Sequence, residues 1–217
     1  MYKDSPSTIR TATLQRWQVV CEATGFLGLT RDYLRIMRGW SSWGRHYHTI
    51  THLEACLKEL DTSRELASAP AAVELGLWFH DVVYSTWRND NEARSADLAM
   101  KLMERKAPQA LVDWVTSAVL ATRHQTIELQ GDLALVVDID LAILGESPDV
   151  YQEFERNVRR EYWWVPRELY VGARRAILQS FLNRNTIYCN NNFRARYEET
   201  ARRNLAAAIE ALQSSLR

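Results

Sequence analysis

Apolar residues recur along this chain at the spacing of an α-helix, and this pattern constrains the fold more than any other feature of the sequence. Few residues interrupt the pattern, because only eight glycines and five prolines are distributed over 217 positions. The apolar residues do not follow the alternating spacing that indicates half-buried strands. We therefore expect an all-α protein.

Glycine and proline mark the ends of the expected helices. Gly25 is a typical helix stop, and Pro70 fits the first turn of a helix. Predicted helices cover residues 8–25, 32–38, 45–60, 71–80, 92–106, 109–122, 133–144, 149–164, 167–184 and 193–212. No internal repeat, low-complexity block or long linker divides them, so we expect residues 1–217 to form a single domain with one core.

Charge and composition argue against several classes of protein. Lys plus Arg and Asp plus Glu both number 27, and a formal net charge of zero argues against a long nucleic acid or a membrane surface as partner. The first residues are polar, and no apolar run approaches the ~20 residues that a membrane-spanning helix needs. We expect a cytoplasmic protein. Cys21, Cys56 and Cys189 form no CxxC pair, so we interpret them as small buried residues.

A histidine and an aspartate stand side by side where an apolar helix is expected to end. His80 and Asp81 follow the apolar run 73–79, and a core helix would not otherwise place two metal-ligand side chains there. Upstream, His48 and His52 are four residues apart and are predicted to share one face of a helix. A zinc protease would need a glutamate directly after the first histidine of such a pair, and Thr49 stands there instead.

Two aspartates in the apolar stretch 136–145 are candidates for a further ligand. Asp138 and Asp140 differ by about 200° around a helix, so only one of them can face a bound ion, and the spacing leaves both open. Two imidazoles and two carboxylates balance a divalent cation and leave coordination positions for water and a phosphate oxygen. Such an ion lowers the pKa of water and polarises a phosphoryl group.

The order His, His-Asp, Asp resembles the HD superfamily of metal-dependent phosphohydrolases, in particular a bacterial branch of predicted members with unassigned substrate. The resemblance is carried by residues 45–52, 80–84, 90–96, 138–145 and 201–205. It implies an HD-type helical bundle that hydrolyses a phosphate ester or anhydride of a small molecule. A nucleotide is the favoured substrate, as in nucleotidases and nucleoside triphosphohydrolases. The implied cofactor is one divalent metal ion, either Mn, Co, Ni, Fe, Mg or Zn.

The resemblance also implies roles for individual residues. The segment from Tyr47 to His52 is similar to the opening motif of cyclic-nucleotide phosphodiesterases, in which the first histidine protonates the leaving oxygen and the second binds metal. By this similarity His48 is the general acid. Related members use the second of the two distal aspartates. The implied metal ligands are therefore His52, His80, Asp81 and Asp140.

Asp90 and Glu92 match an Asp-Asn-Glu segment of the family, which makes them further acid–base candidates. Their ordinary roles would be a helix cap and a first-turn acid.

Four further residues are candidates for substrate contacts. Arg45 and Arg88 flank the motifs and could clamp a phosphate, although arginines are more often solvated. His124 follows a predicted helix and could contact phosphate, bind a second metal or interact with the helix dipole. Trp87 could stack on a nucleobase. Most of the other tryptophans are expected in the core or at a subunit interface, so a homo-oligomer is possible.

Three alternative functions stay open. The chain could be a cyclic-nucleotide phosphodiesterase, or a metal-containing nucleotide sensor that binds its ligand without turnover. A di-iron oxygenase would require additional histidines beside the His-Asp pair, where Val82, Val83 and Tyr84 stand instead.

Overall fold

The computed structural model describes residues 12–125 and 129–215. Within these ranges the chain is helical and contains no strand, which confirms the all-α prediction. The α-helices are α1 (Leu14–Thr24), α2 (Thr30–Trp40), α3 (Ile50–Thr62), α4 (Pro70–Phe79), α5 (Asn91–Met103), α6 (Gln109–Ala121), α7 (Gly131–Asp140), α8 (Pro148–Glu161), α9 (Arg167–Leu182), α10 (Asn191–Phe193) and α11 (Glu199–Ser214). The segments η1 (Arg64–Leu66) and η2 (Leu141–Gly145) are 3₁₀-helical, and η3 (Arg194–Glu198) is π-helical.

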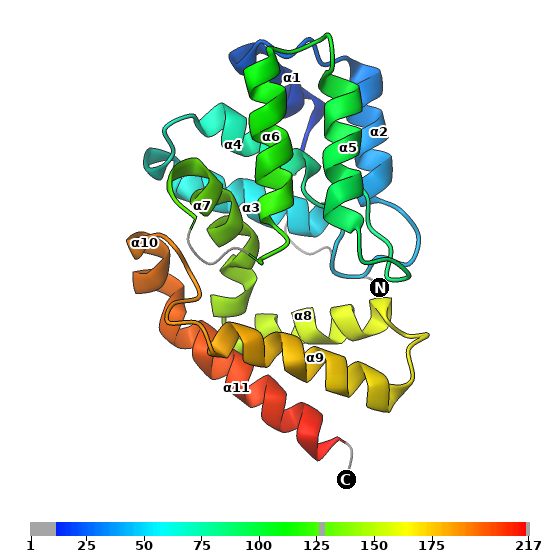
Figure 1. Ribbon diagram of the computed structural model, residues 1–217, viewed down its shortest axis with the longest axis vertical. Helices are drawn as coiled ribbons and strands as arrows, with labels where there is room; N and C mark the ends of the chain where they lie inside the picture. The colour runs from blue at the N-terminus through cyan, green and yellow to red at the C-terminus, as the bar shows by residue number, and fades with distance from the viewer. Residues whose placement is uncertain (1–11, 126–128, 216–217) are drawn as a thin grey trace, which may run out of the picture.

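The helices form an upper group, α1 to α6, and a lower group, α8, α9 and α11, with α7 and η2 leading from one to the other (Figure 1). Buried apolar side chains of both groups belong to one continuous core cluster. Trp17, Trp40 and Trp78 are among its largest fully buried members.

Helix α4 runs through the middle of the upper group. Every residue of its segment 73–79 is buried, as expected for a helix that is apolar on all sides. Its buried acid, Glu74, is paired with Arg16 at 2.9 Å. A Cβ atom at Gly76 would lie 3.2 Å from Cβ of Ala118, so α4 packs closely on α6. The C-terminal end of α4 therefore delivers His80 into the interior of the protein.

The predicted helix at residues 45–60 begins later than expected. Thr49 has an extended backbone and accepts a hydrogen bond from the N–H of Thr51, so it caps α3, and residues 45–49 lie outside the helix. The prediction that His48 and His52 share a helix face is therefore wrong. His52 lies in the first turn of α3, and His48 lies in the preceding loop.

The loop after the His-Asp pair lies directly against α2. A Cβ atom at Gly39 would come within 2.4 Å of the backbone oxygen of Val82, so only glycine permits this approach. Trp40, the next residue, donates a hydrogen bond from its indole N–H to the backbone oxygen of Trp78 at 3.0 Å. These contacts fix the end of α4 against α2.

Most other predicted boundaries agree with the structure to within three residues. Gly25 ends α1 in the left-handed conformation (φ 69°), as predicted. Helix α1 begins after its cap Thr13, and the predicted start at residue 8 lies outside the described residues. The predicted helix 133–144 changes to 3₁₀ geometry after Asp140, and the predicted helix 193–212 is interrupted by the π-helical turn η3. In the part of the chain that the structure describes, no helix is long and apolar enough to cross a bilayer.

Candidate metal centre

Three side chains from separate helices meet at one point inside the bundle. His52 comes from the first turn of α3, His80 caps the C-terminus of α4, and Asp140 ends α7. The Nε2 atoms of His52 and His80 are 3.2 Å apart, and Oδ1 of Asp140 lies 3.1 Å and 3.5 Å from them, respectively. Both histidines are buried. This convergence of nitrogen and oxygen donors is the arrangement that a divalent metal ion requires.

The neighbours of the two imidazoles fix their orientation. Nδ1 of His80 lies 2.8 Å from the backbone oxygen of Leu77, so it donates a proton there and leaves Nε2 as an electron-pair donor in the neutral ring. Trp40 packs against both rings, with its ring centroid 5.1 Å from that of His80 and 6.1 Å from that of His52. Two Nε2 atoms that face each other at 3.2 Å cannot both act as acceptors without a shared proton or cation. The residues therefore fit a metal ion.

Asp81 and Cys56 extend this cluster in two directions. Oδ2 of Asp81 lies 3.5 Å from Nε2 of His80. Sγ of Cys56, one turn after His52, joins His52, His80 and Asp140 in a group whose potential ligand atoms all lie within 4.8 Å of one another. Burial raises the pKa of the Cys56 thiol well above its ordinary value.

The electrostatics of the cluster favour a positive charge at its centre. Burial lowers the pKa of His52. At His80, burial alone would lower the pKa, but the carboxylates of Asp81 and Asp140 outweigh it and raise the pKa to about 9. For Asp140, burial opposes ionisation, yet the neighbouring histidines hold its pKa well below the ordinary value. The same carboxylates that stabilise a protonated imidazole would stabilise a metal cation.

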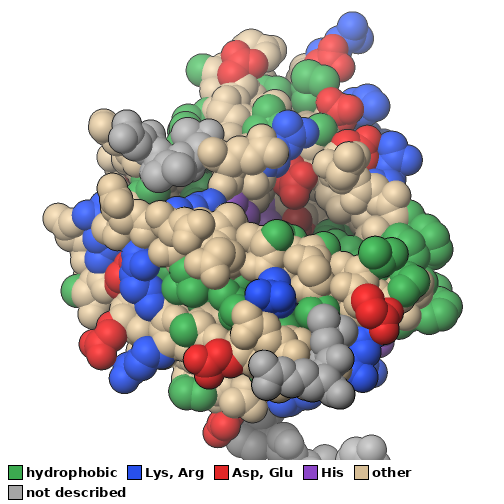
Figure 2. Space-filling model, turned by 60° about the horizontal axis from the view of Figure 1, so that its bottom comes forward, with side chains coloured by type: hydrophobic (Ala, Val, Ile, Leu, Met, Phe, Trp, Pro, Cys, Tyr) green, Lys and Arg blue, Asp and Glu red, His purple; other side chains and the backbone are tan. Residues whose placement is uncertain are grey.

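A cavity of about 460 Å³ opens onto this cluster and reaches His52, Cys56 and Asp140. The charged residues of its wall, apart from these, are Glu59, Glu146 and Glu153. The described residues that line it include no lysine or arginine, although Arg196 is paired with Glu59 of the wall at 2.6 Å. On the face turned forward in Figure 2, histidine side chains lie at the bottom of a hollow beside acidic side chains.

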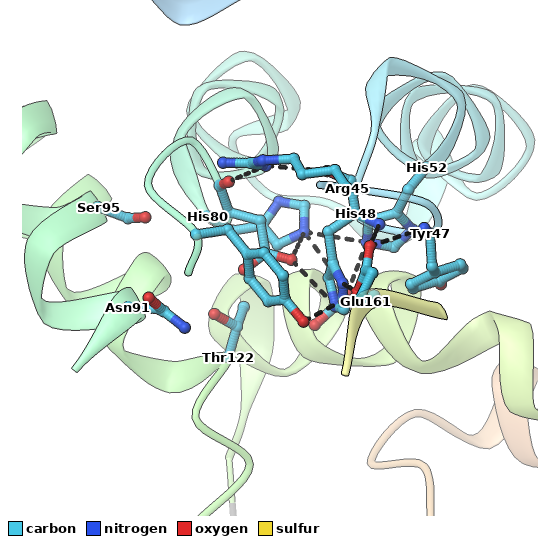
Figure 3. Close-up of polar contacts among 12 residues, drawn as sticks. Arg45, Tyr47, His48, His52, His80, Asn91, Ser95, Thr122 and Glu161 are labelled. Carbon is cyan, nitrogen blue, oxygen red and sulfur yellow. Dashed lines mark hydrogen bonds and ion pairs between the residues drawn. The ribbon is translucent and has the colours of Figure 1, made fainter. Parts of the chain in front are cut away.

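His48 lies next to the cluster and is held by a buried glutamate. Nδ1 of His48 is 2.7 Å from Oε2 of Glu161, and its Nε2 is 3.9 Å from Oδ2 of Asp81 (Figure 3). The imidazole also stacks on the ring of Tyr84 with centroids 4.0 Å apart. The structure therefore places His48 beside the candidate ligands and in contact with one of them.

Glu161 organises the loop that carries His48. Its Oε1 accepts hydrogen bonds from the backbone N–H groups of His46, Tyr47 and His48, at 2.7, 2.7 and 3.0 Å, and the Tyr84 hydroxyl donates to Oε2 at 2.9 Å. Burial would raise the pKa of Glu161, but His48 and the backbone donors outweigh it and lower the pKa to about 2. These three backbone donors explain why the segment 45–49 forms a loop and not the first turn of α3.

The two candidate aspartates face different parts of the protein. Asp138 is fully buried and points away from the histidines. Its carboxylate accepts hydrogen bonds from the backbone N–H groups of Cys189 and Asn190 and from the side-chain amide of Asn190, each at 2.7 Å. Burial raises the pKa of Asp138 in spite of these bonds. Asp140, and not Asp138, lies at the histidine cluster. Asp138 instead anchors the segment before α10.

Arg45 is used to hold the site together. Its guanidinium donates to Oγ of Ser42 at 2.7 Å and to the backbone oxygens of His48, Asp81 and Val82 at 2.9, 2.7 and 3.1 Å. Four of its five N–H donors are thus occupied, and the residue is buried. Arg45 was a candidate for a phosphate contact, but in the structure it ties the loop of His48 to the His-Asp segment.

Arg88, Asp90 and Trp87 lie on the surface. Arg88 forms a two-pronged pair with Asp90, at 2.7 and 2.9 Å, so each neutralises the other. Asp90 precedes α5 but makes no capping hydrogen bond with its side chain. Trp87 stacks on Trp164 with ring centroids 3.7 Å apart, so one face of its indole is already covered. The structure does not bring these three residues to the histidine cluster.

Glu92 and His124 lie nearer to it. Glu92 faces Arg123 at 3.9 Å, and Arg123 is the neighbour of His124 in the chain. Nε2 of His124 is 3.1 Å from Oδ2 of Asp140, the oxygen that does not face His52. His124 also has a positive φ of 56°, and its buried Nδ1 has no hydrogen-bond partner among the described residues. It therefore belongs to the surroundings of the candidate ion.

Sequence reasoning missed Cys56, Tyr84 and Glu161 as members of the site. Cys56 was correctly expected to be buried, as was Cys21, whereas Cys189 is only half-buried. The spacing of Cys56 one turn after His52 was the available signal. No local pattern connects Glu161 with His48, because 113 positions separate them.

A comparison of the sequence with protein-family models found no match. Comparisons with curated proteins and with solved structures found no match either.

Proposed function

We propose that this chain is a metal-dependent phosphohydrolase that acts on a small molecule, with a nucleotide as the favoured substrate class. One observation carries the proposal: three separate segments of the chain bring together His52, the pair His80 and Asp81, and Asp140, in the order that resembles the HD superfamily. The proposal rests on this geometry and on the resemblance of the motifs.

His52, His80, Asp81 and Asp140 would hold the ion. A divalent cation supplies a Lewis acid that polarises a phosphoryl oxygen and lowers the pKa of water toward neutrality. The chain's own contribution is to orient the donors. The bond from His80 to the backbone of Leu77 and the packing of Trp40 do this for the two imidazoles.

His48 is the best-placed general acid. Its Nδ1 is engaged by Glu161, so the proton that it can give to a leaving oxygen is on Nε2, the atom that faces Asp81. The carboxylate of Glu161 fixes this orientation. Glu92 and Asp90 are weaker candidates, because each faces an arginine and neither contacts the histidine cluster.

His124 favours a second possibility, a centre with two ions. Its Nε2 approaches Oδ2 of Asp140, whereas His52 faces Oδ1, so His124 and Asp140 are the residues that would hold a second ion. A two-iron centre would favour the oxygenase reading, whereas one ion per chain favours the hydrolase or a sensor that binds a nucleotide without turnover.

The test is a screen of nucleotides, cyclic nucleotides and generic phosphoesters, each with Mn, Co, Ni, Mg and Zn in turn. We expect hydrolysis of at least one compound with at least one metal, measured by chromatography of the products because opening a cyclic nucleotide releases no free phosphate. This hydrolysis should be lost in His80→Ala and in wild-type protein treated with a chelator. Metal binding without turnover of any substrate would point to the sensor instead. Turnover that persists in His80→Ala would exclude the proposed site.

A further inference from the structure

A second cavity lies between α8, α9 and α11, the three helices of the lower group in Figure 1. Its volume of about 790 Å³ falls within the range of small-molecule sites. Helix α8 separates the two cavities: Tyr151 and Glu155 line this one, whereas Val150 and Phe154 line the one that reaches His52. The second cavity is therefore distinct from the candidate metal centre.

One side of this cavity is apolar. Val171 of α9 and Ala207, Ala208, Ala211 and Leu212 of α11 line it. Three alanines in two turns leave a shallow, smooth surface on α11, which suits an aliphatic chain and offers no hydrogen-bonding group.

The opposite side is strongly basic. Four arginines line it: Arg156, Arg159, Arg160 and Arg167. Among the described residues that line the cavity, Glu155 is the acidic one, and it is already paired with Arg174 at 2.6 Å. None of the four lining arginines forms an ion pair with a described residue, although Arg159 donates to two backbone oxygens. This positive charge is local, since the whole chain has a formal net charge of zero.

Tyr170, which also lines the cavity, carries a buried hydroxyl group. Tyr170 is only 7% exposed, and its hydroxyl makes no hydrogen bond with a described residue. Its ring is held under the guanidinium of Arg159, 4.5 Å from the ring centroid. Buried polar groups are nearly always hydrogen-bonded, so an unpaired hydroxyl in the wall of a cavity points to a ligand that accepts a hydrogen bond from it.

We propose that this cavity binds an amphiphilic anion, with its carboxylate or phosphate head against the arginines and Tyr170 and its aliphatic body along the alanines of α11. Two amide side chains, Gln152 and Asn204, also line the wall, and Asn204 already donates to the backbone oxygens of Leu144 and Glu146. The proposal does not depend on the metal centre or on its activity.

Calorimetric titration of the full chain with octanoate, octyl phosphate, 1-octanol and octyltrimethylammonium tests this proposal. We expect one molecule of an octyl anion to bind per chain. The uncharged and cationic compounds should bind at least about tenfold more weakly, because they lack the charge that the arginines complement. The two anionic arms show whether the head group is a carboxylate or a phosphate.

Variants locate the binding. Arg156→Gln/Arg167→Gln and Tyr170→Phe should each weaken binding of the octyl anion about tenfold. The control Arg35→Gln/Arg38→Gln removes the same charge from α2, away from the cavity, and should bind normally. Equal weakening in the control, or equal binding of octanol, would overturn the proposal. Binding to phosphatidylglycerol vesicles without binding of free octyl anions would also overturn it, as would a dimer that the cavity double variant dissociates.

Discussion

Exchanging Asp138 and Asp140 for asparagine, one at a time, should separate two roles that the structure assigns to carboxylates only two residues apart. Asp138 accepts three hydrogen bonds of 2.7 Å in a fully buried position. Two of these bonds end on Oδ2 and one on Oδ1, so the single oxygen of asparagine can keep two of them, while its NH₂ group faces the N–H of Cys189 and leaves that buried donor without an acceptor. Each hydrogen bond is worth about 1 kcal/mol or somewhat more.

Burial raises the pKa of Asp138, so removing its charge returns part of the cost of desolvation. We therefore expect Asp138→Asn to lower the free energy of unfolding by about 1–3 kcal/mol. For a chain of this length the melting temperature should fall by roughly 2–12 °C. Metal binding should survive in this variant, because Asp138 does not contact the histidines.

Asp140→Asn should show the opposite behaviour. The Asp140 carboxylate lies 3.1 Å from His52, and a neutral amide is a weaker ligand that balances less of the ion's charge. A metal at one hundred times its Kd stabilises the folded protein by about 2.7 kcal/mol, which corresponds to a rise of roughly 5–11 °C in the melting temperature. Wild type and Asp138→Asn should show this rise, and Asp140→Asn should lose it.

Differential scanning calorimetry of the three proteins, with and without each of Mn, Co, Ni, Mg and Zn, measures both effects in one experiment. Loss of the metal-induced rise in Asp138→Asn, with its retention in Asp140→Asn, would refute the assignment. Equal loss in both would show that neither aspartate acts independently of the other.

Three further predictions concern the candidate ligand His52 and the residues around the cluster. Glu161 has a pKa of about 2 against an ordinary 4.5, so its ionised form contributes about 3 kcal/mol to the free energy of unfolding above pH 4.5, and this contribution disappears as the pH falls toward 2. Glu161→Gln should abolish this part of the pH dependence in urea unfolding curves. An unchanged pH dependence would show that Glu161 makes no such contribution. His52→Ala should lose metal in elemental analysis, whereas His48→Ala should keep the metal and lose turnover, and the reverse result would invert their roles. Arg45→Lys leaves at least two backbone oxygens without donors and should cost about 2–4 kcal/mol in chemical denaturation, while Arg88→Lys on the surface should behave as wild type.

The sequence predicts the helices well because their apolar stripes and their glycine and proline boundaries are local signals. His80 at the end of an apolar helix was recognisable for the same reason, and so was the opposite orientation of Asp138 and Asp140.

The loop that carries His48 could not be predicted in this way. Helical spacing over residues 45–60 favours one continuous helix, but Glu161 captures three backbone N–H groups of this segment and holds it open. The fate of Arg45 depends in the same way on backbone oxygens of the His-Asp segment. Such contacts between distant parts of the chain leave no periodic signal in the sequence.

Metal stoichiometry tests the central claim most directly. Equilibrium dialysis against each of the five divalent metals, followed by elemental analysis, should find about one ion per wild-type chain. His80→Ala and Asp81→Ala should bind none while circular dichroism shows an unchanged helix content. A wild-type protein that binds none of the five metals, or variants that bind as well as the wild type, would contradict the metal centre described here.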